Sequence, residues 1–360
     1  MKRHLSILAV LALALAACGT SGDTTNAGPE EANTTTAPAL EAVLLSYSLS
    51  SGDEFRYEVA LDQHIDLTAS GNPSLMGEED VPGEASVDLA GTATFTHVVS
   101  DGPEPGTYEV HITGEFGGVD VTGTVDGQPV ESEEAPDFAA LDPIDVTVIV
   151  DEQGNLIQER LAGAEDPLAG IFGDLGPLGG GGPAPGLDPG QFIGPAFSDV
   201  EVAVGDTWSD EVETPGLGAD PIVTSITSTV TGIEELDGIE VYVIESSSTT
   251  SLIEFDLAEF FAGMFGAFAP DEASPEETAE FEAMLDQLQF LVSVDGTTAD
   301  SRTWFDAEAG VARQSEMTSA TNISMDMNIP DEETGEMVGF VMDMSLDQDI
   351  TYRLISGPTA

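Results

Sequence analysis

Cys18 is the residue of this 360-residue chain whose type and position point most directly to chemistry. It is the only cysteine, and it follows Leu15, Ala16 and Ala17 at the end of an N-terminal apolar run. That run begins at Leu5 and is shorter than a helix needs to span a bilayer. Because there is no second thiol for a disulfide, the cysteine is a candidate for covalent modification at the end of an export signal.

The segment resembles the signals of bacterial lipoprotein precursors, in which basic residues (here Lys2, Arg3 and His4), an apolar stretch and small residues precede the cysteine. The resemblance implies that a signal peptidase removes residues 1–17 and that the Cys18 thiol already carries a diacylglycerol. The expected location is therefore the cell membrane, lipid-anchored on the extracytoplasmic side, with the membrane as a partner through the lipid. The alternatives are an ordinary secretory signal with an incidental cysteine, or a membrane anchor left in place.

Charge is the second informative feature, because the chain has 68 acidic residues against 7 basic ones. Such a chain repels nucleic acid and anionic membrane surfaces, so nucleic-acid binding is excluded and the lipid must supply the membrane attachment. At ~1 M salt the Debye length falls to roughly 3 Å and self-repulsion fades. The composition resembles that of secreted proteins from salt-adapted microbes, with monovalent cations as diffuse counterions.

Specific calcium binding is the alternative explanation of the acidic residues. The cluster nearest to a calcium loop is Asp326-Met327-Asn328, followed by Asp331, Glu332 and Glu333. It lacks the glycine that such a loop has at its sharp turn, so a solvated acidic turn is expected there.

Residue types suited to catalysis are scarce. After the signal the chain has only His64, His97 and His111, and it has no G-x-S-x-G or H-E-x-x-H motif. His97 and His111 could lie on neighbouring strands, but isolated strand histidines are most often surface or satisfied residues, so we predict no metal site. Arg302 and Arg353 are expected to pair with carboxylates, with a lipid-headgroup contact as the alternative. We predict no catalytic residue and no cofactor, and an enzyme is the third hypothesis.

From about residue 43 onward, the sequence has the alternating pattern that is typical of antiparallel strands. These strands are the elements that must position any site. Val, Ile, Thr, Tyr and Phe alternate with polar residues, and Gly, Asp and Pro separate the runs. The predicted strand runs are Phe55–Leu61, Ser86–Val98, Thr107–Phe116, Val119–Val125, Ile144–Val150, Ile222–Val230, Glu240–Ser246, Ser301–Phe305 and Val338–Leu354. The pattern predicts a mainly β, antiparallel fold.

Short motifs recur along the chain at nearly constant spacing. Gly52-Asp53-Glu54-Phe55 matches Gly205-Asp206-Thr207-Trp208, and the Asp-x-x-Gly segment at Asp151 matches the turn at Asp306. This order indicates a duplication, with chance similarity of common turn motifs as the alternative. The expected organisation is residues 18–42 as lipidated cysteine and disordered tether, 43–161 as the first β repeat, 162–195 as a Gly/Pro-rich linker and 196–356 as the second β repeat.

Residues 256–291 depart from the strand-like alternation, because their apolar residues recur at helical spacing. Ser274, Pro275 and Glu277 form a capping box at the start of the second predicted helix. We expect an inserted amphipathic helical hairpin, which serves either as plain core or as a lid over an apolar cavity. The candidate cavity-lining residues are Leu257, Phe260, Phe261, Met264, Phe265, Phe268, Phe281, Met284, Leu285 and Leu288.

An exported, lipid-anchored chain with apolar helices inserted between antiparallel strands resembles the LolA/LppX-like half-barrel lipoproteins. Gly205-Asp206-Thr207-Trp208 and Trp304-Phe305-Asp306 also resemble uncharacterised actinobacterial lipoproteins of two-repeat type. The resemblance implies a curved, half-barrel-like sheet whose concave face the helices cover, with a cavity for acyl chains. The leading hypothesis is a lipid-anchored extracytoplasmic binding protein or carrier for a lipid or other amphiphile. The alternative is a non-catalytic cell-surface structural or interaction module of a salt-adapted bacterium.

Overall fold

The computed structural model describes residues 42–71, 83–129, 144–161, 195–214, 222–256, 289–295, 297–330 and 337–357, and every regular element in these ranges is a β-strand. The strands are β1 (Glu54–Gly71), β2 (Glu84–Asp101), β3 (Thr107–Val125), β4 (Gln128–Pro129), β5 (Ile144–Asp151), β6 (Leu156–Leu161), β7 (Thr207–Thr214), β8 (Ile222–Leu236), β9 (Ile239–Thr250), β10 (Ile253–Asp256), β11 (Gln289–Val294), β12 (Thr298–Asp306), β13 (Val311–Pro330) and β14 (Met337–Ser356). These ranges contain no helix with the length and hydropathy that a membrane span requires.

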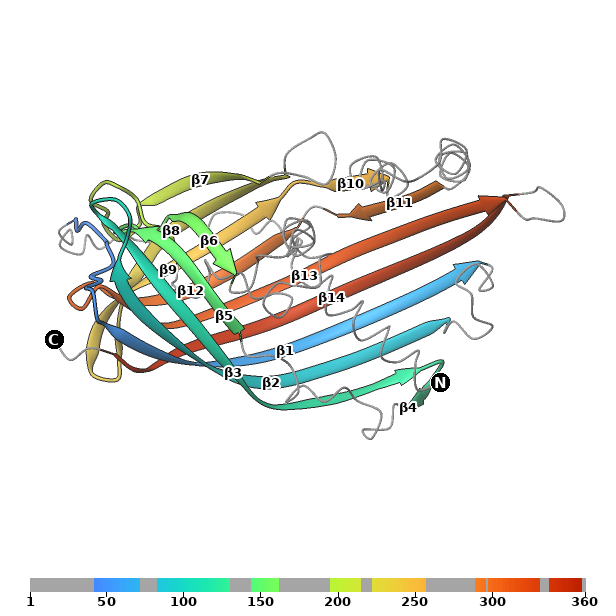
Figure 1. The fold of residues 1–360 in the computed structure, drawn as a ribbon, viewed down its shortest axis with the longest axis horizontal. Helices are drawn as coiled ribbons and strands as arrows, with labels where there is room; N and C mark the ends of the chain where they lie inside the picture. Colours follow the sequence, from blue (N-terminus) through green and yellow to red (C-terminus); the bar gives the residue numbers. More distant parts are fainter. Residues whose placement is uncertain are drawn as a thin grey trace, which may run out of the picture.

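The strands form one antiparallel sheet, so the described chain is a continuous sheet rather than two separate lobes (Figure 1). Along the sheet the order is β6-β5-β3-β2-β1-β14-β13-β12-β9-β8-β7, with β4 paired to β3 and the β10–β11 pair joined to β13. The first long strand, β1, pairs with the last, β14, and this seam joins the two halves of the chain. The prediction of a mainly β, antiparallel fold is confirmed.

Each predicted strand run lies inside an observed strand, with one difference in detail. The runs Thr107–Phe116 and Val119–Val125 are one strand, β3, because its pairing with β2 continues through a register shift between Gly91 and Ala93. A β-bulge of this kind bends a strand without ending it.

Apolar and polar residues alternate along the long strands and give the sheet two different faces. In β1, Val59, Ile65 and Leu67 are buried, whereas Asp62 and Asp66 between them are exposed. Because in-register neighbours point to the same side, this alternation extends across the sheet. We call the side with Val59, Ile65 and Leu67 the inner face, and the acidic side the outer face.

The sheet curls around its inner face at the end where β1 begins, which we call the proximal end. Val148 of β5, Phe95 of β2, Ile350 of β14, Phe305 of β12 and Val230 of β8 belong to one buried cluster, although their strands span most of the sheet. This proximal core therefore holds the curvature of the sheet. The other end, where β1 finishes, is the distal end.

Two segments outside the strands, residues 42–53 and 195–206, cover the proximal core. Val43 and Val202 form a backbone bridge between them. Tyr47 stacks on Phe197 with ring centroids 4.9 Å apart, and its hydroxyl donates to the Pro195 carbonyl at 2.9 Å. These contacts fill the proximal end with protein side chains.

The matching glycine–aspartate motifs have the same local geometry. Gly52 and Gly205 both have φ of 97°, a left-handed conformation that glycine adopts without steric cost. The carboxylates of Asp53 and Asp206 each accept a hydrogen bond, at 2.8 Å, from the backbone N–H three residues earlier. The strand order that follows each motif also corresponds, β1-β2-β3-β5-β6 in the first half and β7-β8-β9-β12-β13 in the second.

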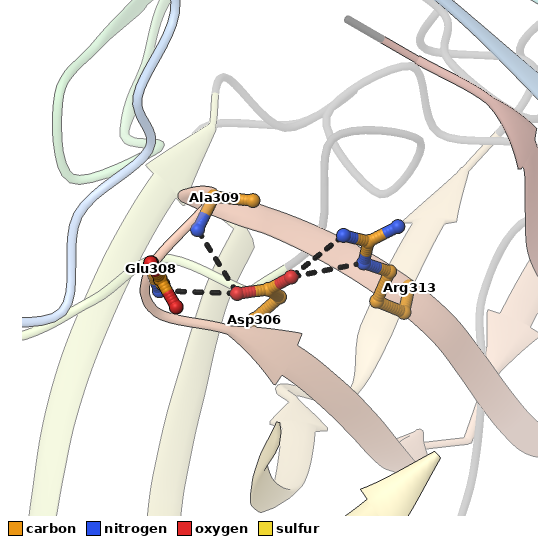
Figure 2. A network of polar contacts seen from close by, with 4 residues as sticks. All are labelled: Asp306, Glu308, Ala309 and Arg313. Atoms are coloured by element: carbon orange, nitrogen blue, oxygen red, sulfur yellow. Dashed lines mark hydrogen bonds and ion pairs between the residues drawn. The ribbon is translucent and has the colours of Figure 1, made fainter. Parts of the chain in front are cut away.

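The second pair of matching motifs are turns that an aspartate stabilises. Figure 2 shows the buried Asp306, whose Oδ1 accepts hydrogen bonds from the backbone N–H groups of Glu308 at 3.1 Å and Ala309 at 2.9 Å. Its Oδ2 accepts from Nε and Nη2 of Arg313 at 3.1 and 2.7 Å. In the corresponding turn of the first half, Asp151 accepts two backbone hydrogen bonds, both at 2.9 Å.

The predicted helical hairpin at 256–291 lies mostly outside the described residues, and its ends are strand rather than helix. β10 finishes at Asp256 and β11 begins at Gln289, so that Asp256 and Leu291 are register partners. The helical prediction was wrong for these end residues, because β11 pairs with both β10 and β13 and this pairing overrides the helical spacing.

Asp306→Ala is expected to lower the free energy of unfolding by about 3 kcal/mol, because it leaves Arg313 unpaired and two turn N–H groups without an acceptor. Urea unfolding at high salt measures this loss. Glu308→Ala changes an exposed side chain of the same turn and is the control, with an expected effect below about 0.5 kcal/mol. Equal effects of the two substitutions would contradict the structural role of Asp306.

Candidate functional site

The distal half of the inner face is a continuous apolar surface on β1, β2, β14, β13 and β11. Its buried residues are Ile65, Leu67, Ala85, Leu89, Val292, Val294, Ile323, Met327, Phe340, Met342, Met344 and Leu346. The strands beneath it are long, with 18 residues in β1 and β2 and 20 in β13 and β14, and they extend to the right in Figure 1 beyond β5, β9 and β12. We call this surface the distal apolar face and take it as the candidate site.

Methionine dominates the centre of the distal apolar face. Met325 of β13 and Met342 of β14 are register partners, and Met327 and Met344 lie two residues away on the same strands. Met327, Met342 and Met344 are buried. Because the unbranched thioether side chain changes shape easily, neighbouring methionines form an adaptable apolar surface that suits flexible alkyl chains.

A row of polar side chains separates the proximal core from the distal apolar face. Gln63 of β1, Gln348 of β14 and Ser319 of β13 are successive register partners across three strands. Thr321 lies two residues beyond Ser319, and Thr297 directly precedes β12. Both glutamines and both threonines are buried, with Gln63 6% and Gln348 3% exposed. We call these five residues the polar belt.

The polar belt has hydrogen-bond donors without acceptors. Ser319 Oγ donates to Gln348 Oε1 at 3.4 Å, which orients that amide. Among the residues that the structure describes, Gln63 Nε2, Gln348 Nε2 and Thr297 Oγ1 have no hydrogen-bond partner. A buried polar group without a partner costs about 1–3 kcal/mol. The belt is therefore the place on the inner face where an added acceptor would be most stabilising.

The proximal core is packing rather than a ligand site. The cavity among Tyr57, His97 and Val110 has a volume of about 20 Å³. That is room for roughly one water molecule. Burial lowers the pKa of His97 to about 3 and raises the pKa of Tyr57, so both groups are neutral at pH 7.

The outer face carries an acidic hollow of about 220 Å³ where β1, β14, β13 and β11 meet. Asp66, Asp295 and Asp343 line it together with neutral residues that include the apolar Ile323 and Met344, and Asp343 Oδ1 accepts a hydrogen bond from Ser324 Oγ at 2.7 Å. Within the described ranges, no group of three His, Cys, Asp or Glu side chains is arranged to hold a metal ion. The hollow therefore combines carboxylates with apolar lining.

His64, His97 and His111 lie apart in the sheet. His97 and His111 are on neighbouring strands, as the sequence suggested, but they point to opposite faces. His97 is 3% exposed on the inner face, whereas the His111 side chain is 45% exposed on the outer face. His64 lies on the outer face, with Nδ1 2.7 Å from Asp88 Oδ1 and Nε2 3.2 Å from Asp66 Oδ2. The hydrogen bond to Asp88 raises the pKa of His64.

Two predicted arginine pairings are confirmed on the outer face. Arg302 Nη2 lies 2.7 Å from Glu234 Oε1, and the same carboxylate accepts from Trp304 Nε1 at 2.9 Å. Arg353 Nη2 lies 3.1 Å from Asp237 Oδ2. Both arginines are thereby paired with carboxylates.

The sequence-predicted site residues lie outside the described ranges. These are Cys18 and the ten candidate lining residues Leu257, Phe260, Phe261, Met264, Phe265, Phe268, Phe281, Met284, Leu285 and Leu288; the predicted signal, and nearly all of the tether and the linker, lie outside them too. The structure does place the two attachments of residues 257–288. Ile253 of β10 and Val292 of β11 belong to the apolar cluster of the distal face or pack against it, so this segment leaves and rejoins the sheet at the border of that face.

Sequence reasoning missed the polar belt, although a signal for it exists. A glutamine interrupts the alternating apolar residues twice: Gln63 stands between Leu61 and Ile65, and Gln348 stands between Leu346 and Ile350. The two interruptions become one site only through the pairing of β1 with β14.

No protein-family model and no curated protein matches this sequence. Among solved structures, the chain is similar to Pseudomonas aeruginosa OpdQ at 9% identity and a TM-score of 0.15, covering 84% of this chain and 97% of that chain. It is also similar to OccK11 (OpdR) of the same organism, at 9% identity and a TM-score of 0.15, covering 87% and 100%. A protein of unknown function from the DUF3598 family of Nostoc punctiforme gives 11% identity and a TM-score of 0.08, covering 79% and 94%. With TM-scores this low, these likenesses support no conclusion on fold or function.

Acidification from about pH 7 to about pH 5 is expected to destabilise the fold through His97. The unfolded chain binds a proton near pH 6.5, whereas burial keeps the folded imidazole neutral down to a pKa of about 3. The unfolded state therefore binds more protons in this window, and stability falls as the pH drops, by about 2 kcal/mol at pH 5. Urea unfolding across the window measures the loss.

His97→Leu is the matched variant, because leucine fills the buried position with an apolar side chain and removes the titrating imidazole. Its stability should no longer fall in this way between about pH 6.5 and about pH 5. His64 adds no slope there, since a raised folded pKa gives a contribution that is fully present below the unfolded pKa. An unchanged slope in His97→Leu would contradict the neutral, buried imidazole.

Proposed function

We propose that this chain is a lipid-anchored extracytoplasmic binding protein or carrier for a lipid or other amphiphile. The observation that carries the proposal is the distal apolar face, a methionine-rich surface on long strands whose opposite side is acidic. Acyl chains on this face would gain about 0.8 kcal/mol for each CH₂ group removed from water. The binding step in this mechanism is burial of alkyl chains, with no covalent chemistry.

Residues 257–288 supply the second part of the proposal. They connect β10 to β11 at the border of the distal apolar face. Their sequence predicts two amphipathic helices, with Phe261, Met264 and Phe265 on the apolar side of the first. In this mechanism the helices form a lid, and the alkyl chains lie between lid and sheet.

The anchor follows from Cys18. Its diacylglycerol would hold the protein on the extracytoplasmic side of the membrane, since two acyl chains give stable attachment where one does not. The acidic outer face, screened by monovalent cations as diffuse counterions, would keep the domain away from anionic headgroups.

We also propose that residues 43–161 and 196–356 are two copies of one β repeat. The equal φ angles at Gly52 and Gly205, the same aspartate contacts and the corresponding strand orders support this duplication. The seam between the copies is the β1–β14 pair, which carries Gln63 and Gln348 of the polar belt.

Native mass spectrometry of the chain from residue 18 onward, carrying Cys18→Ser, tests the function. This version retains every residue that the structure describes. After purification at high salt, a stoichiometric bound amphiphile is expected, and organic extraction would identify it. A bare mass with no uptake of added lipids by a folded sample would contradict the carrier and favour the structural or interaction module.

Met327→Gln together with Met342→Gln is expected to weaken binding of a fluorescent diacylglycerol at least about tenfold, which corresponds to about 1.4 kcal/mol. Glutamine keeps the length of methionine but makes the distal apolar face polar. Val341→Gln, next to Met342 on the other face, is the control and should bind like the wild type. Equal affinities for all three proteins, measured by fluorescence titration, would place the site elsewhere.

A further inference from the structure

The polar belt differs from the surfaces on both sides of it. On the proximal side its neighbours on the inner face are Leu61 and Ile350, and on the distal side they are Ile65 and Leu346. Gln63 and Gln348 are therefore buried amides between two apolar clusters. Natural interiors leave few buried polar groups unpaired, and an unpaired one commonly marks the place of a partner that the chain does not itself supply.

The free atoms of the belt define what such a partner must offer. Gln63 Nε2 and Gln348 Nε2 can only donate, and within the described part of the chain neither meets an acceptor. The partner must therefore present oxygen acceptors. Because Gln63 and Gln348 are register partners on adjacent strands, their Cα atoms are about 5 Å apart, and two acceptor oxygens of one small group can meet both amides.

Charge decides which acceptor fits. The chain has a formal net charge of −61, and its described arginine side chains lie away from the belt, with Arg302, Arg313 and Arg353 paired to carboxylates. Burying an ionised carboxylate or phosphate beside neutral amides, without a cation, is strongly unfavourable. An uncharged carbonyl oxygen gives the same hydrogen bonds without that penalty.

The distal apolar face is long enough for such a ligand. From Gln63 to Gly71, β1 continues for eight residues beyond the belt. At ~3.3 Å per residue this is a path of about 26 Å. One leaflet of a bilayer core is about 15 Å thick, so an acyl chain that starts at the belt fits on the distal apolar face.

We propose that Gln63 and Gln348 bind the ester carbonyls of an uncharged lipid, whose acyl chains lie on the distal apolar face. The inference rests on the proposed carrier function and names the class of its cargo, a neutral lipid ester such as a diacylglycerol. The polar belt would bind the head of the lipid, and the methionines of the distal apolar face would pack against its acyl chains.

The test compares two neutral lipids with identical fluorescent tails, a diacylglycerol and the diether analogue that lacks both carbonyls. The wild-type chain carrying Cys18→Ser is expected to bind the diacylglycerol about tenfold more tightly than the diether, as one or two amide–carbonyl hydrogen bonds would give. Gln63→Leu with Gln348→Leu should abolish that preference by weakening diacylglycerol binding about tenfold. The same variant should unfold at an equal or higher temperature, because leucine removes two unpaired polar groups.

Gln314→Leu is the matched control, since Gln314 Nε2 already donates to Glu316 Oε1 at 2.8 Å on the exposed side. It should keep the wild-type preference. Equal binding of both lipids by the wild type, or a preference that survives in the double variant, would overturn the carbonyl site and leave the carrier intact. Tighter binding of phosphatidic acid with the same tails would overturn the uncharged head. Binding of none of the lipids would overturn the carrier as well.

Discussion

Two-residue alternation along five long strands is the constraint on which the rest of this structure depends. β1, β2, β3, β13 and β14 have 18 to 20 residues each, and their register partners place mainly apolar side chains on one face and polar, often acidic, ones on the other. A slip of one residue in any pair would bury carboxylates such as Asp66 and expose Ile65 and Leu67. With 68 acidic residues in the chain, only a register that sorts the two faces this strictly gives a folded sheet.

The same register places the polar belt at the seam between the first and last long strands. Gln63 and Gln348 come from opposite ends of the chain, and only the β1–β14 pairing makes them neighbours. On the proximal side of the belt, the curl of the sheet closes the proximal core, with Tyr47, Phe197 and Phe305 packed together. On its distal side, the inner face is the distal apolar face. The stabilising core therefore lies at the proximal end of the sheet, and the proposed binding surface lies at its distal end.

The strands were largely predictable, whereas the site was not. In β1 and β14 the apolar alternation is regular, so sequence alone indicated strands there. β13 was not predicted, because Ser319 and Thr321 interrupt the apolar residues of its inner face. It is nevertheless a strand, because its hydrogen bonds to β12 and β14 determine its conformation. Leu291 fitted a helical period, but pairing on both sides of β11 places it in a strand. The polar belt was not predicted, because the residues next to Gln63 or Gln348 in the sequence contain no information on which distant strand lies beside them.

The central claim is that alkyl chains bind to the distal apolar face, and photo-crosslinking tests it most directly. A diacylglycerol with a diazirine in its acyl chain would be bound, irradiated and located by peptide mass spectrometry. Labels are predicted on Met325, Met327, Met342 and Met344, which share the inner face. Labels on the outer-face neighbours Asp326 and Asp343, or a labelled protein without any modified inner-face residue, would contradict the claim.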